Sequence, residues 1–240
     1  MTNMTFECEI CKDTGWIETD NITTECGAIT NGMRRCNCVE VKRCKKILEN
    51  SGIAEAFQSR TVKDYIPKNK QQAVAKSMCI DYIKGFEEIK QNRENSIALL
   101  GQPGAGKTHL LIAIGNALLK SGIGVIYAEY PSMVTQLKQT IRYEEEFQRE
   151  INKYKNAPVL ILDDMYKNML RNGKINESDL NIMFNIINYR YLKKSPTLVS
   201  SEYKLKDLIY FDEAIGSRIG EMAKGRIIEF EGKELNHRMR

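Results

Sequence analysis

Residues 97–108 read IALLGQPGAGKT, a short apolar run followed by a loop rich in Gly and Pro and then by a second apolar segment. The loop matches the spacing G-x-x-x-x-G-K-[ST], with Gly101, Gly106, Lys107 and Thr108 at the fixed positions. Glycines permit positive φ and a close backbone approach, and successive N–H groups before a helix N-terminus form an anion site. We therefore expect Lys107 to reach the β- and γ-phosphates of a nucleotide and the Thr108 hydroxyl to ligate Mg²⁺. The alternative is a Gly-rich turn that binds nothing, and the strand–loop–helix context speaks against it.

The rest of the nucleotide site is expected at the end of a later strand. The apolar run Val159–Leu162 ends in Asp163-Asp164. A carboxylate at the carboxyl end of a strand beside a P-loop holds Mg²⁺, usually through water, and we assign this role to Asp163. Asp164 is placed to orient the attacking water and take its proton. ATP or ADP is expected to contact the loop residues Gly101, Gln102, Pro103, Gly104, Ala105, Gly106, Lys107, Thr108 and His109.

Composition is that of an ordinary globular protein, with 240 residues, 42% of them hydrophobic and 28% charged. No apolar run approaches the ~20 residues of a membrane span, and the first ten residues, MTNMTFECEI, lack the pattern of a secretion signal. We therefore expect a cytoplasmic protein with no membrane partner. The net charge of +5 permits contacts with nucleic acid without requiring them.

Cysteines crowd the N-terminus, where the pairs Cys8-x-x-Cys11 and Cys36-x-Cys38 are separated by a loop with turn-forming residues. In a cytoplasmic protein such crowding favours metal over disulfides. Two close pairs supply four thiolates to a tetrahedral Zn²⁺, and four protein ligands make the site structural. The sequence therefore predicts a small, hairpin-rich zinc module; six unpaired thiols in a loose tail are the alternative.

Other residues of this module leave several interpretations open. Cys26 remains a possible substitute ligand, whereas Cys44 lies in a helix-like basic stretch and is expected to be a free thiol. The basic residues of 42–46 form either a solvated helix face or a contact with nucleic acid. Trp16 and Ile17 either pack on the module or belong to a partner-binding face.

Short apolar runs alternate with helical patterns through the rest of the chain, which predicts a parallel sheet covered by helices on both faces. The expected strands are Ile97–Leu100, Val125–Ala128, Val159–Leu162, Thr197–Ser200 and Ile227–Phe230. The expected core-facing stripes are Val74, Met78, Tyr82 and Phe86 in a helix at 71–91, and Leu180, Met183, Phe184, Ile187 and Tyr191 in a helix at 178–192. We expect a cysteine module at 1–50, an extended linker at 51–70 that lies over the adenine site, and a P-loop ATPase domain at 71–240.

Two polar features late in the chain are candidates for the same site. The strand Thr197–Ser200 runs into Ser201-Glu202, where P-loop ATPases with an additional strand place a polar residue that senses the γ-phosphate. Either Ser200 or Ser201 fits, and Glu202 is expected to contact something else because it would repel phosphate. Arg218 flanks an apolar stripe, so it is either a surface residue or an arginine finger that reaches a neighbouring subunit.

Together these segments resemble the bacterial and phage replicative helicase loaders of the DnaC/DnaI type. CEICKDTGWI and CNCVEVKRCKKILENSGI are similar to the zinc-binding N-terminal module of those loaders. GQPGAGKTHLLIAIGNALL, VLILDDM, NYRYLKKSPTLVSSEY and DEAIGSRI are similar to their AAA+ core, in the same order. The resemblance implies an ATPase that binds the hexameric replicative helicase through its N-terminal module, self-associates through the AAA+ core and helps to place the ring on single-stranded DNA.

The resemblance also implies roles for individual residues. Ser201 lies in the sensor-1 region, Arg218 matches the arginine finger and Arg238 matches the sensor-2 position. Glu202 departs from the family, in which many members have Asn. Because the sequence ends soon after Phe230, we expect no full lid domain. A transposition helper ATPase of the IstB type and a zinc-knuckle adaptor switched by nucleotide remain as alternatives.

Overall fold

The computed structural model describes residues 6–23, 29–49, 59–168, 170–171 and 174–232. Cys26, Arg238 and residues 51–58 of the expected linker lie outside these ranges. Among the described residues, no helix is long and apolar enough to cross a bilayer.

A five-stranded sheet forms the centre of the molecule, and all of its strand pairs are parallel. The order across the sheet is β4-β5-β8-β3-β9. The strands are β3 (Ile97–Gly101), β4 (Val125–Glu129), β5 (Val159–Met165), β8 (Thr197–Ser201) and β9 (Ile227–Phe230). Every residue of β3 and β8 is buried, because helices cover both faces. The predicted α/β fold with five parallel strands is therefore confirmed.

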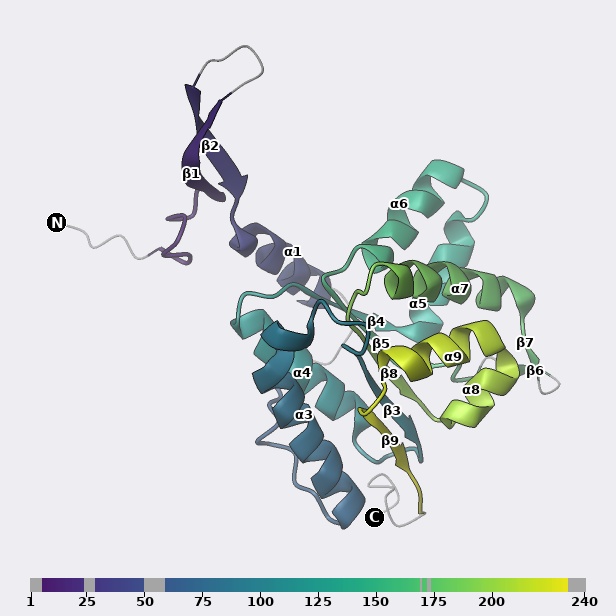
Figure 1. Ribbon diagram of the computed structural model, residues 1–240. Helices are drawn as coiled ribbons and strands as arrows, with labels where there is room; N and C mark the ends of the chain where they lie inside the picture. Colours follow the sequence, from purple (N-terminus) through teal and green to yellow (C-terminus); the bar gives the residue numbers. More distant parts are fainter. Residues whose placement is uncertain (1–5, 24–28, 50–58, 169, 172–173, 233–240) are drawn as a thin grey trace.

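Two layers of helices enclose the sheet (Figure 1). On one face α4 packs on β4, β5 and β8, with α3 beside it and against β9. On the other face α5 packs on β4 and β5, α9 lies against β3, and α7 contacts both of these helices. The helices of the core are α3 (Lys70–Ile89), α4 (Lys107–Lys120), α5 (Tyr130–Thr140), α6 (Glu144–Lys155), α7 (Glu177–Leu192), α8 (Leu205–Phe211) and α9 (Glu213–Met222). A short antiparallel pair, β6 (Leu170–Arg171) and β7 (Lys174–Ile175), follows β5.

The predicted apolar stripes of two helices are partly wrong. In α3, Tyr82 and Phe86 are buried as expected, but Val74 is 49% exposed and Ala75 takes its place in the core. A strict four-residue repeat advances 40° around a helix at each step, so its first member rotates away from the face that buries its last. In α7 the buried face is likewise rotated toward Ile182 and Ile186, which leaves Phe184 exposed.

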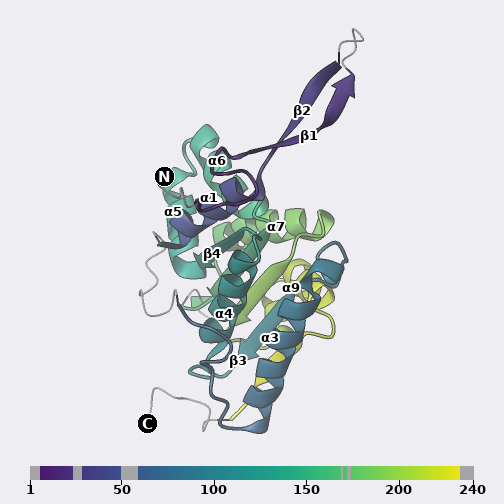
Figure 2. The same ribbon diagram turned by 90° about the vertical axis from the view of Figure 1, so that its left-hand side faces the viewer.

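The N-terminal residues form a β-hairpin and a helix. The hairpin pairs β1 (Trp16–Thr23) with β2 (Ile29–Arg35) and extends away from the sheet, as two perpendicular views show (Figures 1 and 2). The helix that follows, α1 (Asn37–Glu49), packs against β4. Its Cys44 is a free, fully buried thiol near Gly124, as expected of a thiol outside the metal set. The hairpin is therefore anchored to the five-stranded core through α1.

Candidate nucleotide and metal sites

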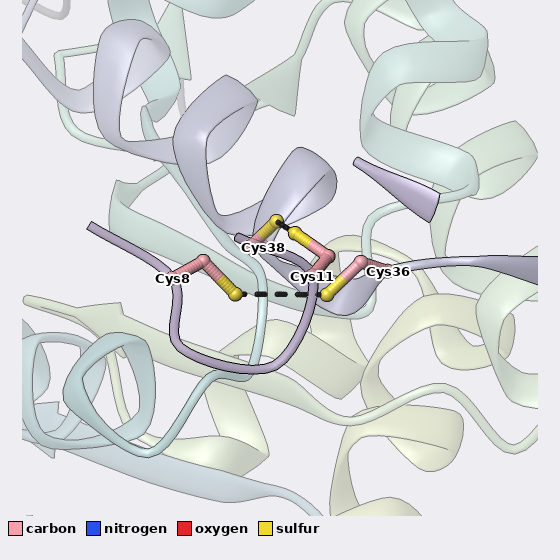
Figure 3. Close-up of side chains that lie close together, drawn as sticks. All are labelled: Cys8, Cys11, Cys36 and Cys38. Carbon is pink, nitrogen blue, oxygen red and sulfur yellow. Dashed lines mark hydrogen bonds between the residues drawn. The ribbon is translucent and has the colours of Figure 1, made fainter. Parts of the chain in front are cut away.

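Four cysteines from the two ends of the hairpin meet at its base (Figure 3). Cys8 and Cys11 precede β1, Cys36 follows β2, and Cys38 lies in the first turn of α1. Their sulfur atoms all lie within 4.8 Å of one another. The Sγ atoms of Cys8 and Cys36 are 3.8 Å apart, and those of Cys11 and Cys38 are 3.4 Å apart.

These distances fit a tetrahedral metal site. With Zn–S bonds of about 2.3 Å, a regular tetrahedron places its sulfur atoms about 3.8 Å apart. Two of the thiols, Cys11 and Cys38, have pKa values that are shifted in opposite directions. Although burial opposes ionisation, hydrogen bonds from the Gly15 backbone and the neighbouring thiols lower the pKa of Cys11 to about 7. The hydrogen bond of Cys38 to Cys11 raises the pKa of Cys38. A bound cation removes this conflict, because it favours the thiolate form of every ligand.

The P-loop joins β3 to α4 through three glycines with positive φ: Gly101 (91°), Gly104 (77°) and Gly106 (88°). Two of these positions have no room for a side chain. A Cβ at Gly101 would lie 2.4 Å from the carbonyl oxygen of Phe230, and one at Gly106 would lie 2.5 Å from the ring of Tyr65. The loop therefore requires glycine for both its backbone conformation and its close packing.

Lys107 is folded back into this loop. Its Nζ donates to the carbonyl oxygens of Gly101, at 2.7 Å, and Gln102, at 2.9 Å. Burial lowers the pKa of this lysine to about 8. The ammonium group thus lies in a glycine-rich loop that leads directly into the N-terminus of α4, and a loop of this kind before a helix N-terminus is typical of phosphate sites.

Asp163 lies at the carboxyl end of β5, with only 2% of its surface exposed. Its carboxylate accepts hydrogen bonds from the hydroxyl groups of Thr108 (3.1 Å), Tyr127 (2.7 Å) and Ser200. Burial raises its pKa against these lowering contacts. The two residues expected to hold Mg²⁺, Thr108 and Asp163, are thus in direct contact. A divalent cation fits here because the site offers a carboxylate and a hydroxyl oxygen, which are its preferred ligands.

A cavity of about 430 Å³ opens above the P-loop. Its size is within the range of small-molecule sites. Residues of the loop, of segment 60–68 and of the strand ends after β5 and β8 surround it: Arg60, Asp64, Tyr65, Ile66, Lys68, Pro103, Gly104, Gly106, Lys107, Thr108, His109, Asp164, Lys167 and Glu202. The cavity therefore joins the P-loop to the second acidic residue, Asp164, in one space.

The described part of the expected linker forms one wall of this cavity and lies over the P-loop. The Tyr65 hydroxyl donates to the carbonyl oxygen of Ala105 at 2.7 Å. The His109 ring bonds to the carbonyl oxygen of Thr61 at 3.1 Å and meets the Tyr65 ring edge-on. This segment has no regular secondary structure and includes a turn in which the N–H groups of Asp64 and Tyr65 donate to the carbonyl oxygens of Thr61 and Val62. It packs on the P-loop through Tyr65, and the predicted contact with an adenine stays a prediction.

Other predicted residues lie apart from the cavity. The Ser201 hydroxyl donates to the carbonyl oxygen of Met165 at 2.7 Å, and within the described chain it is Ser200 that contacts Asp163. Arg218 is not one of the described residues that line the cavity. Its guanidinium lies over the rings of Phe184 and Tyr191 and donates to a backbone carbonyl of its own helix. Arg238 falls outside the described residues.

The comparisons with known proteins agree with this architecture. The model of the family described as "IstB-like ATP binding protein" matches residues 40–218. The chain belongs to this family.

Relatives of this IstB-like ATP-binding chain include proteins named for phage elements, insertion sequences and replication. It is 37% identical to the phage-like element PBSX protein XkdC of Bacillus subtilis (strain 168), over 98% of this chain and 86% of that protein. It is 26% identical to the replicative helicase loader DnaI of the same organism, over 53% of this chain and 39% of that protein. A solved structure, a putative primosome component from Streptococcus pyogenes serotype M3, shares the fold with a TM-score of 0.60 and 26% identity, over 78% of this chain and 95% of that one. The predicted P-loop AAA+ fold is therefore confirmed.

Three side chains at the IstB-like site were not found from the sequence. Tyr127 is in the middle of β4, so the sequence predicts an ordinary core residue at this position. Its contact with Asp163 follows only from the pairing of β4 with β5. Tyr65 lies in a segment without periodicity, 40 residues before its partner Ala105. Lys167 follows Asp164 by three residues, and this spacing alone was a usable signal of a local ion pair.

Proposed function

We propose that this protein is an ATP-dependent loader that binds the hexameric replicative helicase and helps to place it on single-stranded DNA. The observation that carries the proposal is the joining of two sites in one chain. A cysteine-held hairpin projects from the molecule, and α1 anchors it to a core with a nucleotide cavity (Figure 1). The likeness to a protein named as a replicative helicase loader supports this proposal, as does the shared fold with a protein named as a primosome component.

In the core, the proposed roles follow the contacts of each side chain. Lys107 leaves the carbonyl groups of Gly101 and Gln102 and binds the phosphates of ATP. Thr108 and Asp163 hold Mg²⁺, which neutralises phosphate charge when bound. Asp164, whose side chain lines the cavity, orients the water that attacks the terminal phosphate. Hydrolysis is expected to be slow and to depend on assembly or DNA.

In the module, Cys8, Cys11, Cys36 and Cys38 are proposed to bind Zn²⁺ and so to fix the base of the hairpin. An appendage of this size buries little apolar surface, so a metal is a common source of stability. Its large side chains remain exposed: Ile10 by 74%, Met33 by 54% and Trp16 by 47%. We propose that this exposed apolar surface, on and beside the hairpin, binds the helicase.

The remaining parts of the proposal concern assembly. Self-association through the AAA+ core would bring Arg218 of one subunit toward the nucleotide of the next, as an arginine finger. Single-stranded DNA would bind weakly or only to the assembled state, in keeping with a net charge of +5. Ser201 as a phosphate sensor and Arg238 as a second sensor remain predictions. A role at the replication fork would place the protein in the cytoplasm.

A transposition helper ATPase of the IstB type is the second candidate, and the family description favours it. That family model begins at residue 40, so Cys8, Cys11, Cys36 and Cys38 precede the matched region. A helper of this type would not need the hairpin for its partner. A nucleotide-switched adaptor is the third candidate, and it would bind ATP without turning it over.

Native mass spectrometry of the full chain with the replicative helicase from its source tests the proposal. Removing residues 1–50 is unsuitable, because Val41 and Cys44 of α1 belong to the core. The informative variant is Trp16→Ala combined with Met33→Ala, which leaves the cysteines and α1 unchanged. Tyr210→Ala is the matched control, because Tyr210 is 84% exposed on α8, a different part of the molecule.

A complex that forms with the wild type and with Tyr210→Ala, changes between ATP and ADP, and is lost with the double variant would support the loader. No complex in either nucleotide state would contradict it. A complex that the double variant keeps would show that the helicase binds elsewhere.

A further inference from the structure

Lys167 occupies the end of the nucleotide cavity that the strand ends of β5 and β8 form. Its Nζ lies 2.5 Å from Oδ2 of Asp164 and 3.8 Å from Oε1 of Glu202. All three side chains line the same cavity as Lys107 and Thr108. About three quarters of the lysine side chain is buried, so this contact is not an ordinary surface ion pair.

The backbone around Lys167 holds it in this position. Asp164, Tyr166 and Asn168 all adopt positive φ, at 55°, 64° and 57°. Such conformations cost free energy in non-glycine residues, and they persist where surrounding packing over-determines them. Here the Tyr166 ring is fully buried against Tyr130 and Phe211. The Lys167 N–H also donates to the carbonyl oxygen of Asp164 at 3.0 Å, which closes a turn between the two ion-paired residues.

The charges around this lysine conflict with a nucleotide unless the lysine takes part in binding. Asp164 and Glu202 both line the cavity and are acidic. A terminal phosphate placed beyond Lys107 and Thr108 would approach these two carboxylates. The negative charges of the phosphate and the carboxylates would then repel one another. Lys167 lies between them, within ion-pair distance of both. Asp164, moreover, is held by an ammonium group and is not available to orient water.

We propose that Lys167 is a cation that responds to the terminal phosphate: it pairs with Asp164 in the nucleotide-free protein and shifts to the γ-phosphate when ATP binds. Glu202 remains on its other side and limits the movement. The shift offsets the repulsion between phosphate and carboxylates and releases Asp164 toward water. The proposal rests on the ATPase function proposed above and assigns a specific residue to the distinction between ATP and ADP.

Two consequences separate this role from a structural one. ADP lacks the γ-phosphate, so its affinity should not depend on Lys167. ATP should lose a charge-assisted contact when the lysine is neutralised, which corresponds to roughly a 10-fold loss of affinity. A residue that merely supported the loop would affect both nucleotides alike.

The test compares Lys167→Met, Lys167→Arg and the wild type for binding of fluorescent ATP and ADP analogues to the full chain. Lys153→Met is the matched control, because Lys153 also pairs with an acidic residue three positions away, Glu150, at 2.6 Å but on α6. We expect Lys167→Met to weaken ATP about 10-fold with ADP unchanged, Lys167→Arg to restore much of the ATP affinity, and Lys153→Met to resemble the wild type.

Equal effects of Lys167→Met on ATP and ADP, or no effect on either, would overturn the proposal. A selective loss of affinity for ATP, with the affinity for ADP unchanged, in the control Lys153→Met would also overturn it. Failure of the wild type to bind any nucleotide would instead contradict the ATPase function itself. Lys107→Met serves to identify that case, since it should abolish binding of both nucleotides in a protein that otherwise binds them.

Discussion

The buried lysine of the P-loop leads to a prediction about pH. Burial lowers the pKa of Lys107 to about 8 in the nucleotide-free protein, and bound phosphates favour its charged form. ATP binding should therefore take up a proton above pH 8. Between pH 7.5 and 9.5 the protonated fraction of a group with this pKa falls about 25-fold, and the affinity for ATP should fall by the same factor, or about 2 kcal/mol.

Between pH 7.5 and 9.5 the titration of Lys107 can be measured without interference from titration of the nucleotide. The last ionisation of a phosphate group has a pKa of about 6, so ATP keeps its charge throughout the range. The expected loss of ATP affinity can also be distinguished from unfolding of the protein at high pH. The pKa of Lys107 is lower in the folded than in the unfolded protein, so the unfolded chain binds more protons between the two values. This group consequently makes the nucleotide-free protein more stable as pH rises through that window.

Isothermal titration calorimetry of ATP binding measures both quantities. At pH 9.0, titrations in two buffers with different ionisation enthalpies should reveal the uptake of about 0.9 proton for each ATP bound. Thermal unfolding at the same pH values serves as the control for stability. An affinity that stays constant from pH 7.5 to 9.5, or a release of protons at pH 9.0, would refute the assignment of a depressed pKa to this lysine.

Three further substitutions test other parts of the two sites. Tyr127→Phe removes a hydroxyl donor from the buried carboxylate of Asp163, so the free energy of unfolding, measured in urea, should fall by about 1–2 kcal/mol; an unchanged value would mean that the hydrogen bond is not formed. Replacing Cys36 and Cys38 by Ser should release bound zinc, measured by metal analysis, while ATP binding persists; an unchanged zinc content would point to other ligands. Arg218→Ala should keep nucleotide binding and lose assembly-dependent hydrolysis, measured as phosphate release; a wild-type rate under assembling conditions would exclude the finger.

Local patterns in the sequence predicted the fold well. Each of the five short apolar runs became a strand of the sheet. The signal is clearest in β3 and β5, because a strand that is buried on both faces has few polar positions; the edge strand β9 is only half-buried and includes Glu229. The glycines of the P-loop were recognisable for a similar reason. A positive φ at Gly101 and Gly106 admits few other residues, so the requirement is visible in the sequence itself.

Contacts between distant segments were harder to foresee. Tyr127 reaches Asp163 only because β4 and β5 are neighbours in the sheet, and the chain order does not specify that pairing. Tyr65 covers Gly106 through a segment with no periodic pattern. The stripe in α3 was misplaced at Val74 because a four-residue repeat drifts around the helix, and the face that is buried depends on α4 and β9, against which α3 packs.

The choice between Ser200 and Ser201 depends on an irregularity in the sheet. Leu162 pairs with Val199 and Met165 with Ser201, so β5 has one more residue than β8 over this interval. In this bulge Asp163 and Asp164 both oppose Ser200, whose hydroxyl donates to the first carboxylate and accepts from the backbone N–H of the second at 2.9 Å. The extra residue and the positive φ of Asp164 re-aim its side chain into the cavity. A regular strand would turn adjacent carboxylates to opposite faces of the sheet. The bulge therefore brings two consecutive acidic side chains to one end of the cavity, Asp164 as part of its lining and Asp163 in contact with Thr108.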